Sequence, residues 1–300
     1  TVFLENLTTQ EIEGALKGQG LGLELHGFRC VVSSDTGLLA AKIHQLYAGY
    51  QASLSPEGFY DFRISVDRVR RPFRSTEVEF FWEGTSPFPP LPFEQTHPLF
   101  EWGLNWCIAT ASGCDIVVHS AVIERNGKAL VLPGHPGSGK STLCADLALG
   151  KFRLLSDELT IIDPHDRHVR PFPRPISLKN NSIDLIANRH PSALVTKRIT
   201  DTRKGDIAYV PPPSASLVAP SAVPIGWIVF PQYSANSRTE ITPITRANAF
   251  ARLLENAFNV DLIGQTGYIA FAESIAQAEC FDLRYSDLDE VSLWLDELCR

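Results

Sequence analysis

The stretch GHPGSGKST, residues 134–142, most constrains what this 300-residue chain can fold into. It satisfies the pattern G-x4-G-K-[ST], in which glycines let consecutive backbone N–H groups turn inward around an anion. The apolar run KALVLP precedes it as a strand, and the helical pattern KSTLCADLALG follows it. This context favours a phosphate-binding loop over the alternative, a glycine-rich turn that only caps a helix. The sequence therefore predicts an α/β domain organised around this loop.

Every residue of the loop is expected to contribute to nucleotide binding. Lys140 would reach the β and γ phosphates, and the Ser141 hydroxyl would ligate Mg²⁺. The helix N-terminus adds the positive end of its dipole. We therefore expect ATP and Mg²⁺ as cofactors. The expected nucleotide-binding residues are Gly134, His135, Pro136, Gly137, Ser138, Gly139, Lys140, Ser141 and Thr142.

An acidic pair follows the loop helix. Asp157 ends the predicted strand KFRLLSD and Glu158 follows it, and adjacent parallel strands end at the same edge of a sheet, beside the ligand. Asp157 is then a candidate base that orients or deprotonates an attacking hydroxyl, and Glu158 a candidate Mg²⁺ ligand. The alternative is that both are solvated acids at a strand end. Asp163 precedes Pro164 and is expected to start a turn instead.

Four further residues are weaker candidates. His119 opens the first strand of the hairpin HSAVIE-RNG-KALVLP, and antiparallel pairing brings it close to the loop; the alternative is a purely structural histidine. Arg174 and Lys179 in PFPRPISLKNNS, together with Lys204, are the cations suited to a phosphate or an acidic substrate. Without such a role they would be ordinary surface charges.

The chain reads as two domains. Residues 1–95 contain a capping box at Thr8–Glu11, a hairpin around His26-Gly27 and two further paired strands, and are expected to form a smaller α+β domain of unassigned role. Prolines then separate this part from residues 96–300, the expected nucleotide-binding domain. Within it, the proline-rich segment 203–224 is expected to be a long loop that closes over the site.

Composition excludes several classes of function. A formal net charge of −7 argues against a broad nucleic-acid surface. The six cysteines show no C-x-x-C pair, so neither a zinc site nor a disulfide framework is expected. No apolar run approaches the roughly 18 residues that span a bilayer, and the start lacks the plan of a signal peptide. We expect a cytoplasmic protein with reduced thiols and no membrane partner.

The segment HSAVIERNGKALVLPGHPGSGKSTLCADLALGKFRLLSDELTIID resembles the catalytic core of bacterial HPr kinase/phosphorylase. The later segments PFPRPISLK and IVFPQY resemble the HPr-kinase-related proteins (HPr-kinase-related kinase A type) of that family. The resemblance implies the nucleotide-binding fold shared with phosphoenolpyruvate carboxykinase. It also implies a phosphate cradle at 134–142, Asp157 as base assisted by Mg²⁺ on Glu158, and a functional His119. The family's E-I-R-G-type segment is absent, which leaves the substrate and reverse phosphorolysis open.

The sequence thus predicts an ATP- and Mg²⁺-dependent kinase that transfers the γ-phosphate to a hydroxyl, the acceptor being a serine of a small HPr-like protein. One alternative is a small-molecule kinase that acts on an acidic or hydroxylated metabolite. A second is a P-loop ATPase or switch with no acceptor, although the L-S-G-G-Q segment of transporter-type ATPases is missing. The resemblance also implies a homo-oligomer.

Overall fold

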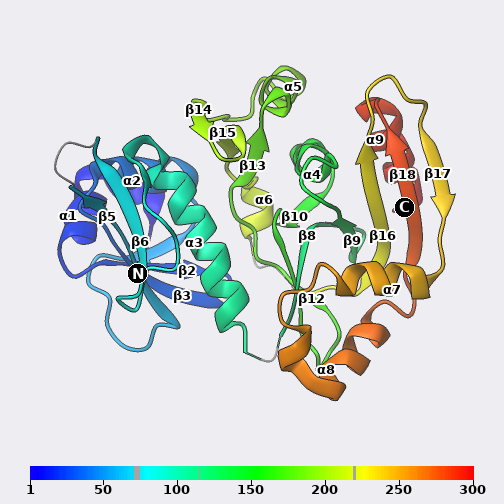
Figure 1. Ribbon diagram of the computed structural model, residues 1–300, viewed down its shortest axis with the longest axis horizontal. Helices are drawn as coiled ribbons and strands as arrows, with labels where there is room; N and C mark the ends of the chain where they lie inside the picture. Colours follow the sequence, from blue (N-terminus) through cyan, green and yellow to red (C-terminus); the bar gives the residue numbers. More distant parts are fainter. Residues whose placement is uncertain (71–74, 114, 219–220) are drawn as a thin grey trace. The chain divides into compact units, whose positions relative to one another are not determined.

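The computed structural model describes residues 1–70, 75–113, 115–218 and 221–300. Helices and several sheets make up a mixed α/β architecture, as the sequence predicts (Figure 1). The chain divides into two compact units. Unit 1 contains residues 1–111 and 197–206, and unit 2 contains residues 112–196 and 207–300.

Unit 1 is built on a sheet with the strand order β1-β4-β2-β3-β5-β6-β7. The capping box is confirmed: the Glu11 amide donates to Thr8 Oγ1 at 3.2 Å, and the Thr8 amide donates to the Glu11 carboxylate at 2.7 Å. The hairpin at His26-Gly27 is confirmed too. The helices and strands of unit 1 are β1 (Val2–Phe3), η1 (Leu4–Asn6), α1 (Thr9–Lys17), β2 (Leu21–Leu25), β3 (Phe28–Ser33), α2 (Gly37–Leu46), β4 (Gln51–Ser53), β5 (Phe62–Val69), β6 (Glu77–Trp82), β7 (Leu91–Pro92), η2 (Phe93–Gln95), α3 (Thr96–Ala111) and β14 (Ile199–Thr202).

Unit 2 contains a sheet with the strand order β12-β11-β8-β9-β16-β18-β17, and β10 also pairs with β8. The strand that enters the glycine loop, β9, runs parallel to β16, and β16 runs parallel to β18. On its other side β9 is antiparallel to β8. The strands are β8 (Ile116–Arg125), β9 (Lys128–Pro133), β10 (Arg153–Ser156), β11 (Leu159–Ile162), β12 (Val169–Arg170), β16 (Ile225–Tyr233), β17 (Glu240–Pro243) and β18 (Glu279–Tyr285).

The acidic pair is positioned differently from the sequence prediction. β10 is not adjacent to β9, because β8 lies between them and is antiparallel to both. β10 and β11 lie one after the other along the same side of β8, and Asp157 and Glu158 occupy the break between them. A β-bulge at Leu155 precedes this break, since Leu154 pairs with Ile123 and Ser156 with the adjacent Val122.

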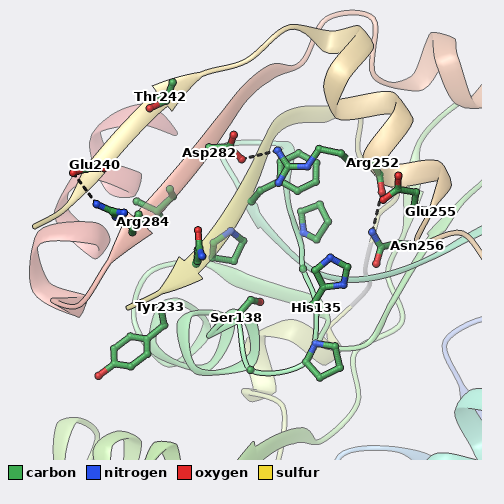
Figure 2. A pocket seen from close by; sticks show the side chains of 18 residues that line it. His135, Ser138, Tyr233, Glu240, Thr242, Arg252, Glu255, Asn256, Asp282 and Arg284 are labelled. Carbon is green, nitrogen blue, oxygen red and sulfur yellow. Dashed lines mark hydrogen bonds and ion pairs between the residues drawn. The ribbon is translucent and has the colours of Figure 1, made fainter. Parts of the chain in front are cut away.

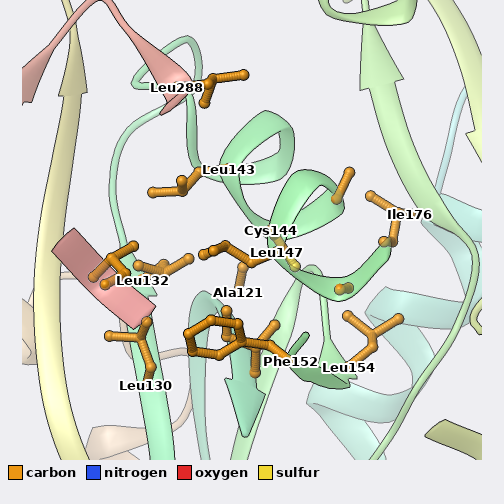
Figure 3. Packing of buried hydrophobic residues seen from close by; sticks show 14 of the residues in the cluster. Ala121, Leu130, Leu132, Leu143, Cys144, Leu147, Phe152, Leu154, Ile176 and Leu288 are labelled. Atoms are coloured by element: carbon orange, nitrogen blue, oxygen red, sulfur yellow. The ribbon is translucent and has the colours of Figure 1, made fainter. Parts of the chain in front are cut away.

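Helices cover both faces of this sheet, and each face has its own core. On one face α4 (Lys140–Leu149) buries Leu143, Cys144 and Leu147 against β8, β9 and α9 (Leu288–Leu298), as Figure 3 shows. The other face packs against α7 (Arg246–Leu254) and α8 (Val260–Ser274), which is kinked at Gly264. The Thr245 side chain caps α7 by accepting from the Asn248 amide. The loop helix is thus anchored in the core of one face of the sheet.

The long loop predicted over residues 203–224 is largely absent. Gly205–Val210 form β15, which pairs antiparallel with β13 (Ile176–Lys179), and Ser214–Leu217 form the short helix α6. Four consecutive residues of β15, Ile207 to Val210, are buried, so the strand is covered on both faces, and this outweighs the prolines that follow. The expectation of one long loop is therefore wrong for residues 205–210 and 214–217, while residues 219 and 220 lie outside the described residues. Helix α5 (Asn181–Arg189) follows β13.

Cys30, Cys107, Cys144, Cys280 and Cys299 are buried and form no disulfide with one another, and Cys114 lies outside the described residues. Within the described part of the chain, no helix combines the length and the apolar character that a membrane crossing requires.

Candidate functional site

The glycine loop of unit 2 has the backbone that an anion nest requires. Gly137 and Gly139 have φ values of 88° and 92°, in the left-handed region that favours glycine. A Cβ atom on Gly139 would collide with the Tyr285 hydroxyl, so the position also requires glycine sterically. Tyr285 Oη donates to the Gly139 carbonyl at 3.3 Å, and the Tyr233 amide donates to the Ser138 carbonyl at 2.9 Å. The ends of β16 and β18 therefore hold the loop in place through its backbone carbonyls.

Lys140 begins α4 and its side chain is buried. Its Nζ lies 3.0 Å from His119 Nε2 and donates to the Gly134 carbonyl at 3.5 Å. Burial lowers the pKa of Lys140, while the charges of Glu158 and Asp157 raise it in part. The ammonium group thus lies among the groups that the sequence predicted around the transferred phosphate.

His119 links the loop lysine to the acidic pair. The same Nε2 that contacts Lys140 lies 3.0 Å from Glu158 Oε2. One ring nitrogen either accepts from Lys140 or donates to Glu158, so the tautomer of His119 decides which of the two bonds forms. The ring also stacks on Phe258, with centroids 5.9 Å apart. His119 is therefore held in place on both sides.

Pairing with β8 explains why these groups meet. Ser120 of β8 pairs with Pro133, the last residue of β9, and His119 pairs with Leu159, the first residue of β11. The end of β9 and the break before β11 therefore flank the same point of β8. This register places the loop, His119 and the acidic pair side by side, and it replaces the common edge that the sequence argument assumed.

Asp157 is the more deeply buried acid of the pair, with 3% of its surface exposed. Its Oδ2 accepts from the Ser177 amide of β13 at 3.1 Å. Its Oδ1 is buried and has no hydrogen-bond partner among the described residues. A buried carboxylate oxygen without a partner is unfavourable in an isolated protein, so it marks a position where a bound group would complete the site.

The two adjacent carboxyl groups have opposite pKa shifts. Burial, followed by the charge of Glu158, raises the pKa of Asp157 to about 6. For Glu158, burial acts to raise the pKa, but the hydrogen bond with His119 and the charges of Lys140 and Lys179 lower it on balance. Titratable neighbours whose pKa values are pushed apart are typical of an acid–base site. Asp157 can exchange a proton near neutral pH, whereas Glu158 stays ionised.

The raised pKa of Asp157 predicts that Asp157→Asn stabilises the fold at neutral pH. Its folded pKa lies above the unfolded value of about 3.9. The stability that Asp157 contributes is thus full below about pH 4 and is lost as the pH rises through about 6. Above that pH the free energy of unfolding of Asp157→Asn should exceed that of the unaltered chain by up to about 3 kcal/mol. Urea unfolding between pH 4.5 and 7.5, without nucleotide or Mg²⁺, measures this gain; a gain independent of pH would contradict it.

The donor set fits a magnesium ion bound together with a nucleotide. Mg²⁺ prefers oxygen ligands and is usually held by one or two carboxylates plus phosphate oxygens and water. The Glu158 carboxylate beside the loop lysine provides such an oxygen, and Ser141 adds a hydroxyl at the first turn of α4. Among the described residues, no group of three or more His, Cys, Asp or Glu forms a metal site by itself.

The predicted substrate cations divide into three cases. Lys179, the last residue of β13, lies close enough for its charge to lower the pKa of both Asp157 and Glu158. Arg174 is buried, and its guanidinium carbon lies 5.2 Å from the centroid of the Phe172 ring. Lys204 belongs to unit 1, where its Nζ lies 4.8 Å from the Trp102 ring centroid. The structure therefore brings Lys179 into the cluster of the acidic pair.

Sequence reasoning missed several residues of the site. Ser177 donates to Asp157, Phe258 stacks on His119, and Tyr233 and Tyr285 support the loop. The two tyrosines could have been predicted from the sequence, because each is the last residue of a strand, and both strands run parallel in the sheet that contains the loop strand. Ser177 and Phe258 carried none, since they reach the site by long-range packing.

No protein-family model and no curated protein sequence matches this chain. Among solved structures, the HPr(Ser) kinase/phosphatase from Coxiella burnetii is similar with a TM-score of 0.27 and 9% sequence identity. That match covers 61% of this chain and 92% of the Coxiella chain. A likeness this low assigns no function to the chain.

Proposed function

We propose that this chain is a kinase that uses MgATP and transfers the γ-phosphate to a hydroxyl group, with unit 2 as a P-loop domain of the phosphoenolpyruvate carboxykinase-like type. The observation that carries the proposal is the pair Asp157–Glu158. His119 Nε2 lies 3.0 Å from both Glu158 Oε2 and the loop lysine Nζ, and the buried Asp157 Oδ1 has no hydrogen-bond partner among the described residues. The pKa values of the two acids are also shifted in opposite directions. A loop that only bound a nucleotide would not need a buried acid that titrates near neutral pH.

The roles follow from position and charge. The inward N–H groups of the loop and Lys140 would hold the phosphates and offset the negative charge that spreads over the transferring group. Asp157 would accept the proton of the attacking hydroxyl as its oxygen bonds to the γ-phosphorus. The bond from that phosphorus to the bridging oxygen then breaks, and ADP leaves. Mg²⁺ bound by Ser141 and Glu158 would supply further positive charge to the phosphate oxygens.

His119 would act as a positioning residue in this scheme. It contacts Lys140 and Glu158 through one nitrogen, 3.0 Å from each partner atom. A ring fixed by the stack on Phe258 would keep the lysine and the carboxylate at a set separation. Its removal would disturb the placement of both groups without removing the base.

Two classes of acceptor hydroxyl are candidates. The resemblance in sequence favours a serine on a small HPr-like protein. An acidic or hydroxylated metabolite is the second candidate, and Lys179 favours it because a cation beside the acidic pair could bind an anionic acceptor. If a water molecule takes the place of the hydroxyl, the same groups would catalyse ATP hydrolysis.

Incubation with γ-labelled ATP and a cell lysate tests the proposal. Label in a protein band supports a protein acceptor, and label in a small molecule supports the metabolite kinase. If free phosphate is the only labelled product, both kinase hypotheses are wrong and the protein is an ATPase. A Lys140→Ala control run in parallel should show no transfer, because removing the lysine leaves the β and γ phosphates without their main cation.

A further inference from the structure

A pocket of about 660 Å³ lies beside the first half of the glycine loop, within unit 2 (Figure 2). Its lining comes from loop residues 133–138, from the ends of β16 and β18, and from β17 and α7. Its volume is within the usual range of small-molecule sites, about 300–1,000 Å³. Building on the proposed function, we propose that this pocket binds the nucleoside part of the donor nucleotide.

The location of the pocket shows whether it suits the donor or the acceptor. Residues 133–138 of the loop line the pocket, so a molecule bound there can extend directly into the phosphate-binding part of the loop. Lys140, His119, Asp157 and Glu158 do not line it. An acceptor hydroxyl has to reach Asp157, whereas the base and ribose of the donor lie at the end of the nucleotide away from the transferred phosphate. The pocket therefore suits the donor's nucleoside and not the acceptor.

The charges of the pocket favour an uncharged group over an anion. Its two arginines already have partners: Arg252 Nη1 lies 2.6 Å from Asp282 Oδ1, and Arg284 Nη2 lies 3.1 Å from Glu240 Oε1. Both pairs are visible in Figure 2. Glu255 adds a further carboxylate to the lining. A phosphate or a carboxylate ligand would meet more acids than available cations here, whereas a base and a ribose would meet hydrogen-bond acceptors.

Arg252 provides a flat surface on which a base can stack. Its guanidinium carbon lies 3.7 Å from the centroid of the Phe230 ring, and Asp282 holds one edge of the group. The side chain is 37% exposed, so the planar group is fixed but accessible. Stacking of nucleobases on arginine planes is a common mode of recognition.

Two neighbours of Arg252 can read the edge of the nucleoside. Asn256 donates its side-chain amide to the Arg252 carbonyl at 2.8 Å, which fixes the orientation of the amide and leaves its oxygen as an acceptor. The Glu255 carboxylate accepts hydrogen bonds. Both groups suit the exocyclic amine of a base or the hydroxyls of a ribose.

Calorimetric titration with two probes tests the assignment. MgATP reports on the loop and the pocket together, whereas magnesium tripolyphosphate reports on the loop alone. Arg252→Ala should weaken MgATP binding about 5- to 100-fold, the effect of losing one stacked base, and leave tripolyphosphate affinity unchanged. Arg252→Lys keeps the cation beside Asp282 but removes the plane, so it should weaken MgATP in the same selective way even if the alanine variant folds poorly.

Arg167→Ala is the matched control, because Arg167 is 51% exposed, pairs with Glu273 at 2.8 Å and is not part of the pocket. It should change neither affinity. The assignment is overturned if the Arg252 variants bind MgATP as tightly as the unaltered chain, or if they lose both probes equally. Binding of neither probe by the unaltered chain would instead overturn the proposed function, and the assignment with it.

Discussion

Asp157→Asn is expected to reduce phosphoryl transfer by about 10²- to 10⁴-fold, the usual contribution of a positioned base, while MgATP affinity stays largely intact. Asparagine has nearly the same shape and can still accept from the Ser177 amide. It cannot take up a proton from the attacking hydroxyl. The rate of transfer from labelled ATP and the calorimetric affinity for MgATP together measure this separation of chemistry from binding.

Asp163→Asn is a matched control for this change. Asp163 also follows a strand of the same sheet, but its side chain accepts from the His165 amide at 2.8 Å and pairs with Arg170. It should leave both transfer and binding unchanged. Loss of MgATP binding in Asp157→Asn would show that Asp157 is a metal ligand or a structural residue, and unchanged transfer would remove it from the mechanism.

Asp146→Ala is expected to lower the free energy of unfolding by about 3 kcal/mol, because it breaks a buried ion pair and leaves its partners uncompensated. The Asp146 carboxylate of α4 accepts from Arg189 Nε at 2.9 Å, from His190 Nε2 at 2.8 Å and from Ser292 Oγ at 2.7 Å. Burial acts to raise the pKa of Asp146, but these bonds, led by Arg189, lower it on balance. Urea unfolding at neutral pH measures the loss.

Asp289→Ala tests whether the large stability loss expected for Asp146→Ala is due to the burial of Asp146. Asp289 pairs with the same Arg189 at 2.8 Å, but its side chain is 76% exposed. Exposed pairs contribute about 0–1 kcal/mol, so this variant should unfold close to the unaltered chain. Equal losses for the two variants would show that the Asp146 network stabilises no more than a surface ion pair does.

The loop was predictable because its signal is local. A strand, glycines that adopt positive φ and a helix are encoded within about 20 neighbouring residues, and the structure reproduces this order with positive φ at Gly137 and Gly139. The hairpin at Asn126-Gly127 was equally local, since both positions take positive φ. Neither prediction required knowledge of distant contacts.

The surroundings of the acidic pair were only partly predictable. Its closeness to Lys140 was expected, but from the wrong strand arrangement, because sequence does not show that β10 and β11 share one side of β8. Arg252 and Phe230 are 22 positions apart, and no pattern in the sequence connects them. Their contact depends on how α7 packs on the sheet, which no local pattern encodes.

The bulge at Leu155 has a consequence for how this chain tolerates changes in length. The extra residue sets the alternation of side chains for Ser156, Asp157 and Glu158 against β8. Deleting one residue between Arg153 and Ser156 would restore regular pairing and turn the carboxyl group of Asp157 to the opposite face of the sheet. The turn from Asp163 to His168 lies beyond the paired part of β11 and has no such constraint. Natural variants of this chain should therefore differ in length at that turn, while the number of residues from Arg153 to Glu158 stays constant.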